Sequence, residues 1–383
     1  MSRKLLTFFK IYPYALLYGF GTPLLCAGLI LLVRTWPQLG QLYAAHIFPF
    51  FPNSLGRILS LFPFSVLEMD LYLLVSILTA GVVLLLTAFA AYMLQAINKK
   101  AGLYAFVSLA ILRAVPKALI LLLCLASTAI LMLTLACGLN YSREGIASDI
   151  GIFPAPAAHQ DLVQLSSLLI ADLQETIPLL SDTSLDTDSL HRESTLAMEN
   201  LGFRYPTLSG YYPKPKPVLM SSWMSQLNLT GLFSPYTIEA NYNNDVLAYI
   251  KPYTICHELA HLKGYIREDE AGFIAYLACS RSSSPELRYS GTLNALSYVL
   301  AALYEDSSQE EYQQLLLQLP ERALADLTEN NQYWDQYQGS ASRLSAAAND
   351  TYLKANAQAN GIQSYGQMVD LLLAYYGLNN QSV

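Results

Sequence analysis

Three apolar runs of about 20 residues near the start of the chain constrain its fold more than any other feature. They are Tyr14 to Val33, Leu71 to Leu94 and Ala118 to Cys137. A helix rises about 1.5 Å per residue and the hydrocarbon layer of a bilayer is roughly 30 Å thick, so one such run crosses a membrane once. The sequence therefore predicts a membrane region over residues 1–137 with three spanning helices.

The composition supports a membrane protein and excludes several other classes. Of the 383 residues, 53% are hydrophobic and 13% are charged, whereas soluble domains carry about 25% charged residues. The net charge of −7 and the lack of a Lys/Arg cluster argue against a nucleic-acid surface, so we expect no nucleic-acid partner. The five cysteines have neither the spacing of a zinc finger nor that of a disulfide framework.

The basic residues beside the runs predict how the chain crosses the membrane. Residues 1–10 carry three Lys or Arg, and residues 96–117 carry four. By the positive-inside rule, both segments lie in the cytoplasm. The first run is long for a signal peptide and no small-x-small site precedes Arg34, so we expect it to remain as an anchor. Three spans then place residues 138–383 outside the cytoplasm.

The connection between the first two runs, residues 34–70, has an unusual composition. It contains the aromatic and proline-rich stretch His46-Ile-Phe-Pro-Phe-Phe-Pro. Aromatic residues are frequent where a membrane meets water. We therefore expect interfacial or re-entrant structure on the outer side.

Residues 138–383 have the patterning of a folded domain. Helical patterns occur from Gln160 to Leu180 and from Gly291 to the end, and strand-like segments from Pro217 to Met220 and from Gly231 to Ala240. A domain of about 245 residues is large enough to bury its own core. The expected fold class is membrane-anchored α+β, with three N-terminal transmembrane helices followed by a mostly helical domain that contains a small sheet.

One segment of this domain, ICHELAHLKGYIREDEAGFIAYLAC (255–279), has the spacing of a metal site. His257 and His261 are four residues apart, so on a helix they share one face and can bind one ion. Glu258 is turned about 100° from His257, which lets it reach a metal-bound water without being a ligand. This is the H-E-x-x-H arrangement of zincins. The alternative is an ordinary amphipathic helix with two hydrogen-bonded histidines and a solvated Glu258.

The third metal ligand is less evident from the sequence. A catalytic zinc has three protein ligands and one open position. In some zincins a glycine three residues after the second histidine turns the chain, and a third histidine follows three residues later. Gly264 occupies the glycine position here, but Arg267 occupies the position of the third histidine and cannot bind a metal. The following E-D-E-A instead matches the start of E-x-x-A-[DN], in which the Glu is a ligand, although Gly272 departs from the pattern. We expect Glu268 to be the third ligand, with Glu270 as the alternative.

Residues on either side of the motif are candidates for substrate binding and catalysis. The segment from Phe233 to Asn244 is typical of a strand and turn, and zincins bind an extended peptide along an edge strand at this place. Glu239 and Asn241 are therefore candidate substrate-binding residues. Tyr289 is a candidate phenol for stabilising an oxyanion. The remaining residues of metal-binding type are expected on the surface or in loops (His46, His159, His191) or in the core (Cys256, Cys279).

Several short motifs are spread over nearly the whole chain. They are Pro63-Phe-Ser, Gly138-Leu-Asn-Tyr, Glu239-Ala-Asn, H-E-L-A-H with E-D-E-A and A-Y-L-A-C, Tyr289-Ser-Gly, and Asn349-Asp-Thr-Tyr-Leu-Lys. With the three spans, they resemble a family of bacterial membrane proteins, domain of unknown function 3810. Its members have Asn at the position of Gly272 and Gln at that of Leu262. The resemblance implies a zincin-like membrane protein and indicates no substrate.

The resulting hypothesis is a zinc-dependent metallopeptidase of the bacterial cell membrane, an endopeptidase rather than an exopeptidase. Zn²⁺ would be held by His257, His261 and Glu268, and Glu258 would activate the zinc-bound water. The alternative is a catalytically degenerate zincin-fold sensor or scaffold that binds a peptide or protein at the cell surface. The expected partners are a peptide or protein substrate and the lipid bilayer.

Overall fold

The computed structural model describes residues 12–98, 102–155, 158–356, 358 and 367–378. The chain forms two compact units. One comprises residues up to Thr35 together with Val66–Leu135, and the other comprises Trp36–Ser65 together with the residues from Ala136 onward. Residues 36–65, which the sequence analysis groups with the membrane region, thus belong to the second unit.

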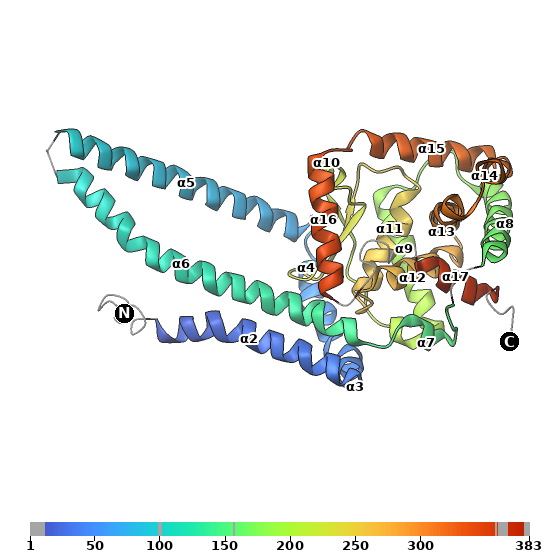
Figure 1. Ribbon diagram of the computed structural model, residues 1–383, viewed down its shortest axis with the longest axis horizontal. Helices are drawn as coiled ribbons and strands as arrows, with labels where there is room; N and C mark the ends of the chain where they lie inside the picture. Colours follow the sequence, from blue (N-terminus) through green and yellow to red (C-terminus); the bar gives the residue numbers. More distant parts are fainter. Residues whose placement is uncertain (1–11, 99–101, 156–157, 357, 359–366, 379–383) are drawn as a thin grey trace. The chain divides into compact units, whose positions relative to one another are not determined.

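The first unit consists of three long helices (Figure 1): α2 (Pro13–Thr35), α5 (Val66–Asn98) and α6 (Gly102–Ala136). Each contains a stretch long and apolar enough to cross a membrane, over Pro13–Thr35, Val66–Ala90 and Ala114–Ser142. The prediction of three such helices is confirmed. The basic residues 3, 4, 10, 99 and 100, on which the predicted sidedness depends, lie outside the described residues.

Helices α2 and α6 pack closely along one side. Leu123 lies so near Gly19 that a Cβ atom there would be 2.5 Å from its side chain. Ser127 Oγ donates a 2.7 Å hydrogen bond to the carbonyl oxygen of Gly19, and the hydroxyls of Tyr18 and Thr128 are 2.7 Å apart. Small residues and hydroxyl groups of this kind hold helices together in lipid, where hydrophobic burial contributes little.

The second unit is mostly helical with a small sheet, as predicted. Before the sheet its helices are α3 (Pro37–Leu42), η1 (Tyr43–Ile47), η2 (Pro52–Gly56), α4 (Arg57–Leu59), η3 (Gly138–Ser142), α7 (Ile146–Ile150), α8 (His159–Thr176), η4 (Ile177–Leu179), α9 (Thr187–Arg204) and η5 (Pro206–Leu208). Within and after the sheet they are α10 (Ser221–Gln226), α11 (Ile250–His261), α12 (Glu268–Ser280), α13 (Pro285–Asp306), α14 (Gln309–Leu316), α15 (Glu321–Asp335), α16 (Ser340–Ala355) and α17 (Met368–Tyr376).

The sheet has three short strands, β1 (Lys216–Val218), β2 (Gly231–Ser234) and β3 (Glu239–Asn243), in the order β1-β3-β2. Strand β1 is parallel to β3, and β2 is antiparallel to it. The strand-like segment expected over residues 231–240 is divided between β2 and the start of β3. The chain turns after Ser234, whose hydroxyl accepts a 3.2 Å hydrogen bond from the Thr237 backbone N–H, and Ser followed by Pro235 is typical of a turn.

Helices α11 and α12 form the centre of the second unit. Every residue of α12 from Glu270 to Cys279 is buried. Helix α12 packs against α11, α13, α9 and α17. Cys256 and Cys279 are fully buried in this core, as expected. The two helices that carry the H-E-x-x-H motif and the acidic residues after it are therefore held rigidly.

Candidate metal centre

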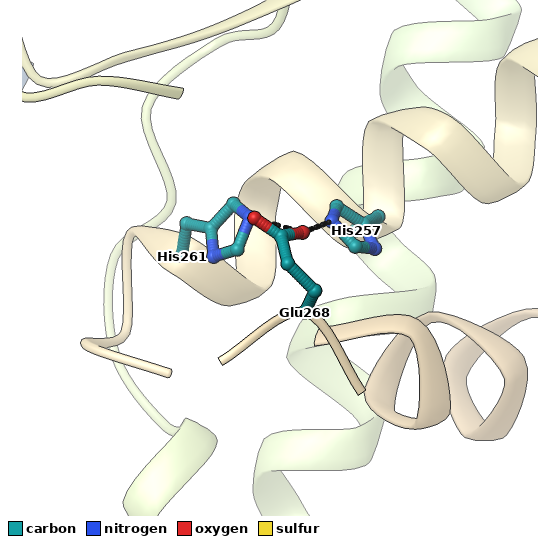
Figure 2. Close-up of side chains that lie close together, drawn as sticks. All are labelled: His257, His261 and Glu268. Carbon is teal, nitrogen blue, oxygen red and sulfur yellow. Dashed lines mark hydrogen bonds and ion pairs between the residues drawn. The ribbon is translucent and has the colours of Figure 1, made fainter. Parts of the chain in front are cut away.

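Helix α11 holds both histidines of the motif on one face. It begins at Ile250, and Pro252 lies in its first turns, where a missing backbone N–H removes no helical hydrogen bond. The rings of His257 and His261 have centroids 4.8 Å apart and perpendicular planes. Both rings face the start of α12 (Figure 2).

A tight turn after α11 brings the chain back toward the histidines. Gly264 in this turn has a φ of +82°, a left-handed conformation that glycine adopts without strain. A Cβ atom there would lie 3.1, 3.2 and 3.3 Å from atoms of Asn140, Phe48 and Arg143. Arg143 Nη1 also donates a 2.7 Å hydrogen bond to the carbonyl oxygen of Lys263. The turn therefore needs glycine and is braced from outside.

Glu268, the first residue of α12, places its carboxylate between the two rings (Figure 2). Its Oε2 atom is 3.0 Å from His257 Nε2 and 3.7 Å from His261 Nε2. One donor atom from each of the three side chains lies within 4.8 Å of the others. His261 is buried, while His257 and Glu268 are partly exposed. The cluster is therefore open on one side.

The hydrogen bond of His261 to Tyr265 determines which of its ring nitrogens is available to a metal ion. His261 Nδ1 lies 2.7 Å from the carbonyl oxygen of Tyr265. A carbonyl oxygen can only accept, so Nδ1 carries the hydrogen and Nε2 of the neutral ring has a free lone pair. Metal-binding histidines are commonly oriented by a bond of this kind.

The charges of the cluster depend on one another. Burial lowers the pKa of His261, but the hydrogen bond and charge of Glu268, together with the charge of Glu258, raise it to about 9. Burial raises the pKa of Glu268, but the hydrogen bonds from the two histidines hold it well below its usual range. At neutral pH the site therefore combines a carboxylate with a proton on imidazole. A divalent cation can replace that proton.

Glu258 is buried beside the cluster and lies under strand β2. Gly231 of β2 has no room for a Cβ atom, because that atom would collide with Oε1 of Glu258. Oε2 of Glu258 is buried and has no hydrogen-bond partner. Burial raises the pKa of Glu258 to about 6, although the charges of His257 and His261 oppose this shift. An unpaired buried carboxylate oxygen is costly unless a ligand or water meets it.

Glu270, the alternative ligand, points elsewhere. Its Oε1 accepts a 3.0 Å hydrogen bond from the Ile146 backbone N–H, and it lies against Gly145. Burial raises the pKa of Glu270 to about 7. The structure thus brings Glu268 to His257 and His261, whereas Glu270 joins α12 to the segment that begins α7.

The candidate substrate-binding residues Glu239 and Asn241 are on β3, the central strand, and both side chains are buried. Asn241 Nδ2 donates to the carbonyl oxygen of Leu232, 3.2 Å away. The strand beside the motif is instead β2, which pairs only with β3 among the described residues. Leu232 of β2 is 41% exposed. The structure does not place Glu239 or Asn241 on an open cleft, because both side chains are buried; β2 pairs with both residues and β1 with Asn241.

Tyr289 is not brought to the cluster either. Its hydroxyl donates a 2.6 Å hydrogen bond to Asp326 Oδ2, and its ring packs on Tyr249. Both tyrosines line a cavity of about 380 Å³ whose wall includes neither of the motif histidines. The hydroxyl of Tyr289 is therefore hydrogen-bonded to a carboxylate in a different part of the unit.

Two other tyrosines near the cluster, Tyr253 and Tyr298, are not indicated by the motifs in the sequence. The ring of Tyr253 is 6.4 Å from that of His257, one turn earlier on α11. Burial and then the charge of Glu268 raise the pKa of Tyr298 to about 12, so it remains a hydrogen-bond donor at neutral pH. The i, i+4 spacing of Tyr253 and His257 could have revealed the first, but no local signal relates Tyr298 on α13 to the motif.

Gly272 has a steric reason for its departure from the E-x-x-A-[DN] pattern. A Cβ atom there would lie 2.9 Å from Tyr253 Oη and 3.1 Å from Met368 Sδ. The space that an Asp or Asn side chain would need is therefore filled. Tyr253 Oη itself donates to Met368 Sδ at 3.3 Å.

The remaining histidines lie apart from the cluster. His46 is exposed, and His159 is partly exposed with its ring nitrogens on Asp306 and Glu311. The prediction of a surface or loop position is wrong for His191. It belongs to the buried stripe of α9, with its Nε2 atom 3.0 Å from Tyr242 Oη.

The sequence profile of a family described as protein of unknown function (DUF3810) matches residues 43–373. This match covers most of the chain, so the chain belongs to that family. No curated protein and no solved structure matches the chain.

Proposed function

We propose that this DUF3810 protein is a membrane-anchored zinc metallopeptidase that cleaves peptide bonds outside the cytoplasm. One observation carries the proposal: His257, His261 and Glu268 converge on one point, and the buried, unpartnered oxygen of Glu258 lies beside them. The distribution of Lys and Arg around the spans supports the outer location of residues 138–383.

The three donor groups fit a catalytic zinc ion. Two imidazole nitrogens and one carboxylate oxygen are a common ligand set for catalytic zinc, which keeps a fourth position open. The side chains of His257 and Glu268 are 12% and 16% exposed, so the fourth position would be reached from their side of the cluster. Zinc bound here would supply a Lewis acid that polarises a peptide carbonyl and makes water more acidic.

Glu258 would act as the general base. Its pKa of about 6 lies closer to neutral pH than that of an ordinary glutamate. A carboxylate with such a pKa can take a proton from the attacking water and later pass it to the leaving amine. Because Oε2 has no protein partner, this proton has a free oxygen on which to reside.

Strand β2 supports a peptide as the substrate. It is an edge strand among the described residues and lies directly over Glu258. An extended chain can pair with such an edge through its backbone. A peptide that pairs along a strand places one of its internal bonds, rather than its terminus, at the cluster. We therefore propose an endopeptidase.

The test is proteolysis by the full-length protein in lipid nanodiscs, with an unstructured protein as substrate. We expect Glu258→Gln to reduce hydrolysis on the order of 10²–10⁴-fold, because the general base is lost, while zinc content stays at one ion per chain. Glu270→Gln is the matched control and should retain activity, since Glu270 does not contact the cluster. Equal turnover by the Glu258→Gln protein would refute the mechanism.

A second candidate function is a zinc-containing scaffold that binds a peptide without cleaving it. The observation in its favour is Gly272, where Tyr253 and Met368 leave no space for the carboxylate or amide that would orient a histidine. Zinc-loaded protein that binds peptides and leaves a broad peptide library uncut would favour this function over the peptidase.

A further inference from the structure

The segment between the first two apolar helices, residues 36–65, is part of the compact unit that contains the metal centre. Arg57 is its only Lys, Arg, Asp or Glu. A stretch of this length with one charged residue is unusual for a surface segment of a water-soluble domain. Its side chains therefore need an apolar environment on more than one side.

One face of this segment packs on the second unit. The buried positions repeat every three or four residues: Gly40, Tyr43, Ala44, Phe48, Pro52 and Gly56. Two π-helical turns, η1 and η2, widen the helix, as shown by the 2.9 Å bond from Phe48 N–H to the carbonyl oxygen of Tyr43. The wider turns keep a four-residue repeat on one face.

The contacts of this buried face reach the metal centre. Gly40 lies against Ser142, and Gly56 lies against Pro213, so closely that a Cβ atom on either glycine would collide. The ring of Phe48 is 3.2 Å from the position that a Cβ atom of Gly264 would take. Gly264 is in the turn between His261 and Glu268, so the segment touches the element that joins two of the proposed ligands.

Polar contacts fix the same segment further. The ammonium group of Lys216, which is buried, donates to the carbonyl oxygens of Leu59 and Phe62. The guanidinium of Arg57 lies 3.9 Å from the ring centroid of Tyr211. The only charged group of the segment is thus bound to a neighbouring aromatic ring. These bonds hold the segment as a rigid part of the unit.

The opposite face is exposed and carries large apolar side chains that are 54–83% accessible: Trp36, Leu42, Ile47, Phe50, Ile58 and Leu61. The polar residues Gln38, His46, Asn53 and Arg57 of the segment are also exposed. Exposed hydrophobic patches of this kind mark contact with a partner or a membrane. The exposed face and the buried face belong to the same short helices.

The chain itself shows which partner covers this face. Thr35 ends one helix of membrane-spanning length and Val66 begins the next. Where both helices cross the bilayer, both ends of the segment lie at the same membrane surface. We propose that the exposed face of residues 36–62 enters the interface of the bilayer and holds the metal centre at the lipid surface. Apolar and aromatic side chains with no net acidic charge are suited to this layer.

This lipid contact does not depend on the proposed peptidase activity. It does suggest a substrate class, polypeptide stretches close to the membrane surface, and that class rests on the proposed function. The experiment that tests the contact therefore measures lipid proximity alone, so its failure and the failure of the peptidase proposal are distinguishable.

The test uses tryptophan fluorescence of the full chain in phosphatidylcholine nanodiscs. The three native tryptophans are replaced (Trp36→Phe, Trp223→Phe, Trp334→Phe), and one reporter is added at Phe50→Trp. The matched control is Leu317→Trp, at a position 77% exposed after α14. We expect lipids with brominated acyl chains to quench most of the emission at position 50 and little at position 317. Iodide in the buffer should act in the opposite sense.

Two outcomes would overturn the proposal. Quenching at position 50 by iodide and not by brominated lipid would show that the face is in water. Quenching by neither would show that protein, such as a second copy of the chain, covers it. Should Phe50→Trp fail to fold, Leu61→Trp, at a position 83% exposed, is the second reporter on the same face.

Discussion

Two buried histidine environments in the second unit behave in opposite ways. His261 is 6% exposed and His191 is 5% exposed, so burial alone does not separate them. Glu268 raises the pKa of His261 to about 9 despite burial. His191 has only the hydroxyl of Tyr242 on its Nε2 atom, and burial lowers its pKa to about 4.

The difference shows that a neighbouring carboxylate, rather than the histidine itself, stabilises positive charge at a buried imidazole. Burial in a medium of low polarity disfavours a charged imidazole. At neutral pH His191 is therefore uncharged and serves packing between α9 and β3. At the cluster, the negative charge of Glu268 compensates for burial, and the same charge that holds a proton can hold a metal ion.

Removal of the carboxylate is the strongest way to break this comparison. We expect Glu268→Gln to weaken zinc binding by at least about 100-fold, because a neutral amide is a poor zinc ligand and loses the charge. The measurement is competition for zinc between the full-length protein and a chelator of known affinity.

Glu270→Gln is the control for this experiment, since it makes the same chemical change two residues away on α12. Its affinity should stay within a few-fold of the unaltered protein, because the Glu270 carboxylate bonds to the Ile146 N–H rather than to the cluster. Equal losses in both variants would assign the effect to α12 as a whole and contradict the proposed ligand set.

A second prediction concerns the proton in metal-free protein. Without Glu268, burial is the largest influence on the pKa of His261, as it is for His191. We therefore expect Glu268→Gln to lower the pKa of His261 from about 9 to below its ordinary value of 6.5. NMR titration of the imidazole resonances, assigned by single histidine substitutions, measures this shift. A pKa that stays near 9 would mean that Glu258 alone retains the proton.

A third and smaller effect is expected at His191. Its folded pKa of about 4 lies below the unfolded value of 6.5, so the unfolded chain binds the proton first as the pH falls. Stability is therefore unaffected above pH 6.5 and is lost progressively between pH 6.5 and 4. At pH 5 this loss is about 1 to 2 kcal/mol in the free energy of unfolding, and His191→Gln should abolish it.

Urea unfolding of the metal-free protein at pH 7.5 and pH 5 measures this difference. His159→Gln is the control, because Glu311 and Asp306 raise the pKa of His159, and its replacement should give no gain at pH 5. Equal acid sensitivity of the His191→Gln and unaltered proteins would show that His191 titrates normally in the folded state.

Much of the candidate site was predictable because it depends on local spacing. The four-residue spacing of His257 and His261 puts both on one face of α11, and Gly264 occupies the turn that the sequence analysis assigned to it. The match to E-x-x-A favoured Glu268 over Glu270, and the structure brings Glu268 to the histidines, but local spacing alone left Glu270 as an alternative. The choice depends on the rotation of α12 about its axis, which packing against α11 and the segment at Ile146 determines.

Other expectations failed because they involve residues far apart in the sequence. Glu239 and Asn241 were expected near substrate, but the pairing of β1 with β3, whose partners are separated by 24 intervening residues, makes their strand central. Tyr289 follows the motif closely in sequence, yet its hydroxyl meets Asp326 on α15. His191 has polar neighbours in the chain and a buried position in the fold.

By itself, the sequence determined three helices long and apolar enough to span a membrane, the H-E-x-x-H helix and the turn after it. These follow from helix rise, side-chain periodicity and the backbone freedom of glycine, which act over a few residues. Only the tertiary structure decided which acid meets the histidines, which strand forms the edge beside Glu258, and that residues 36–65 join the second unit, with Phe48 against the turn at Gly264. Those features depend on contacts between distant segments, whose free energies no local pattern records.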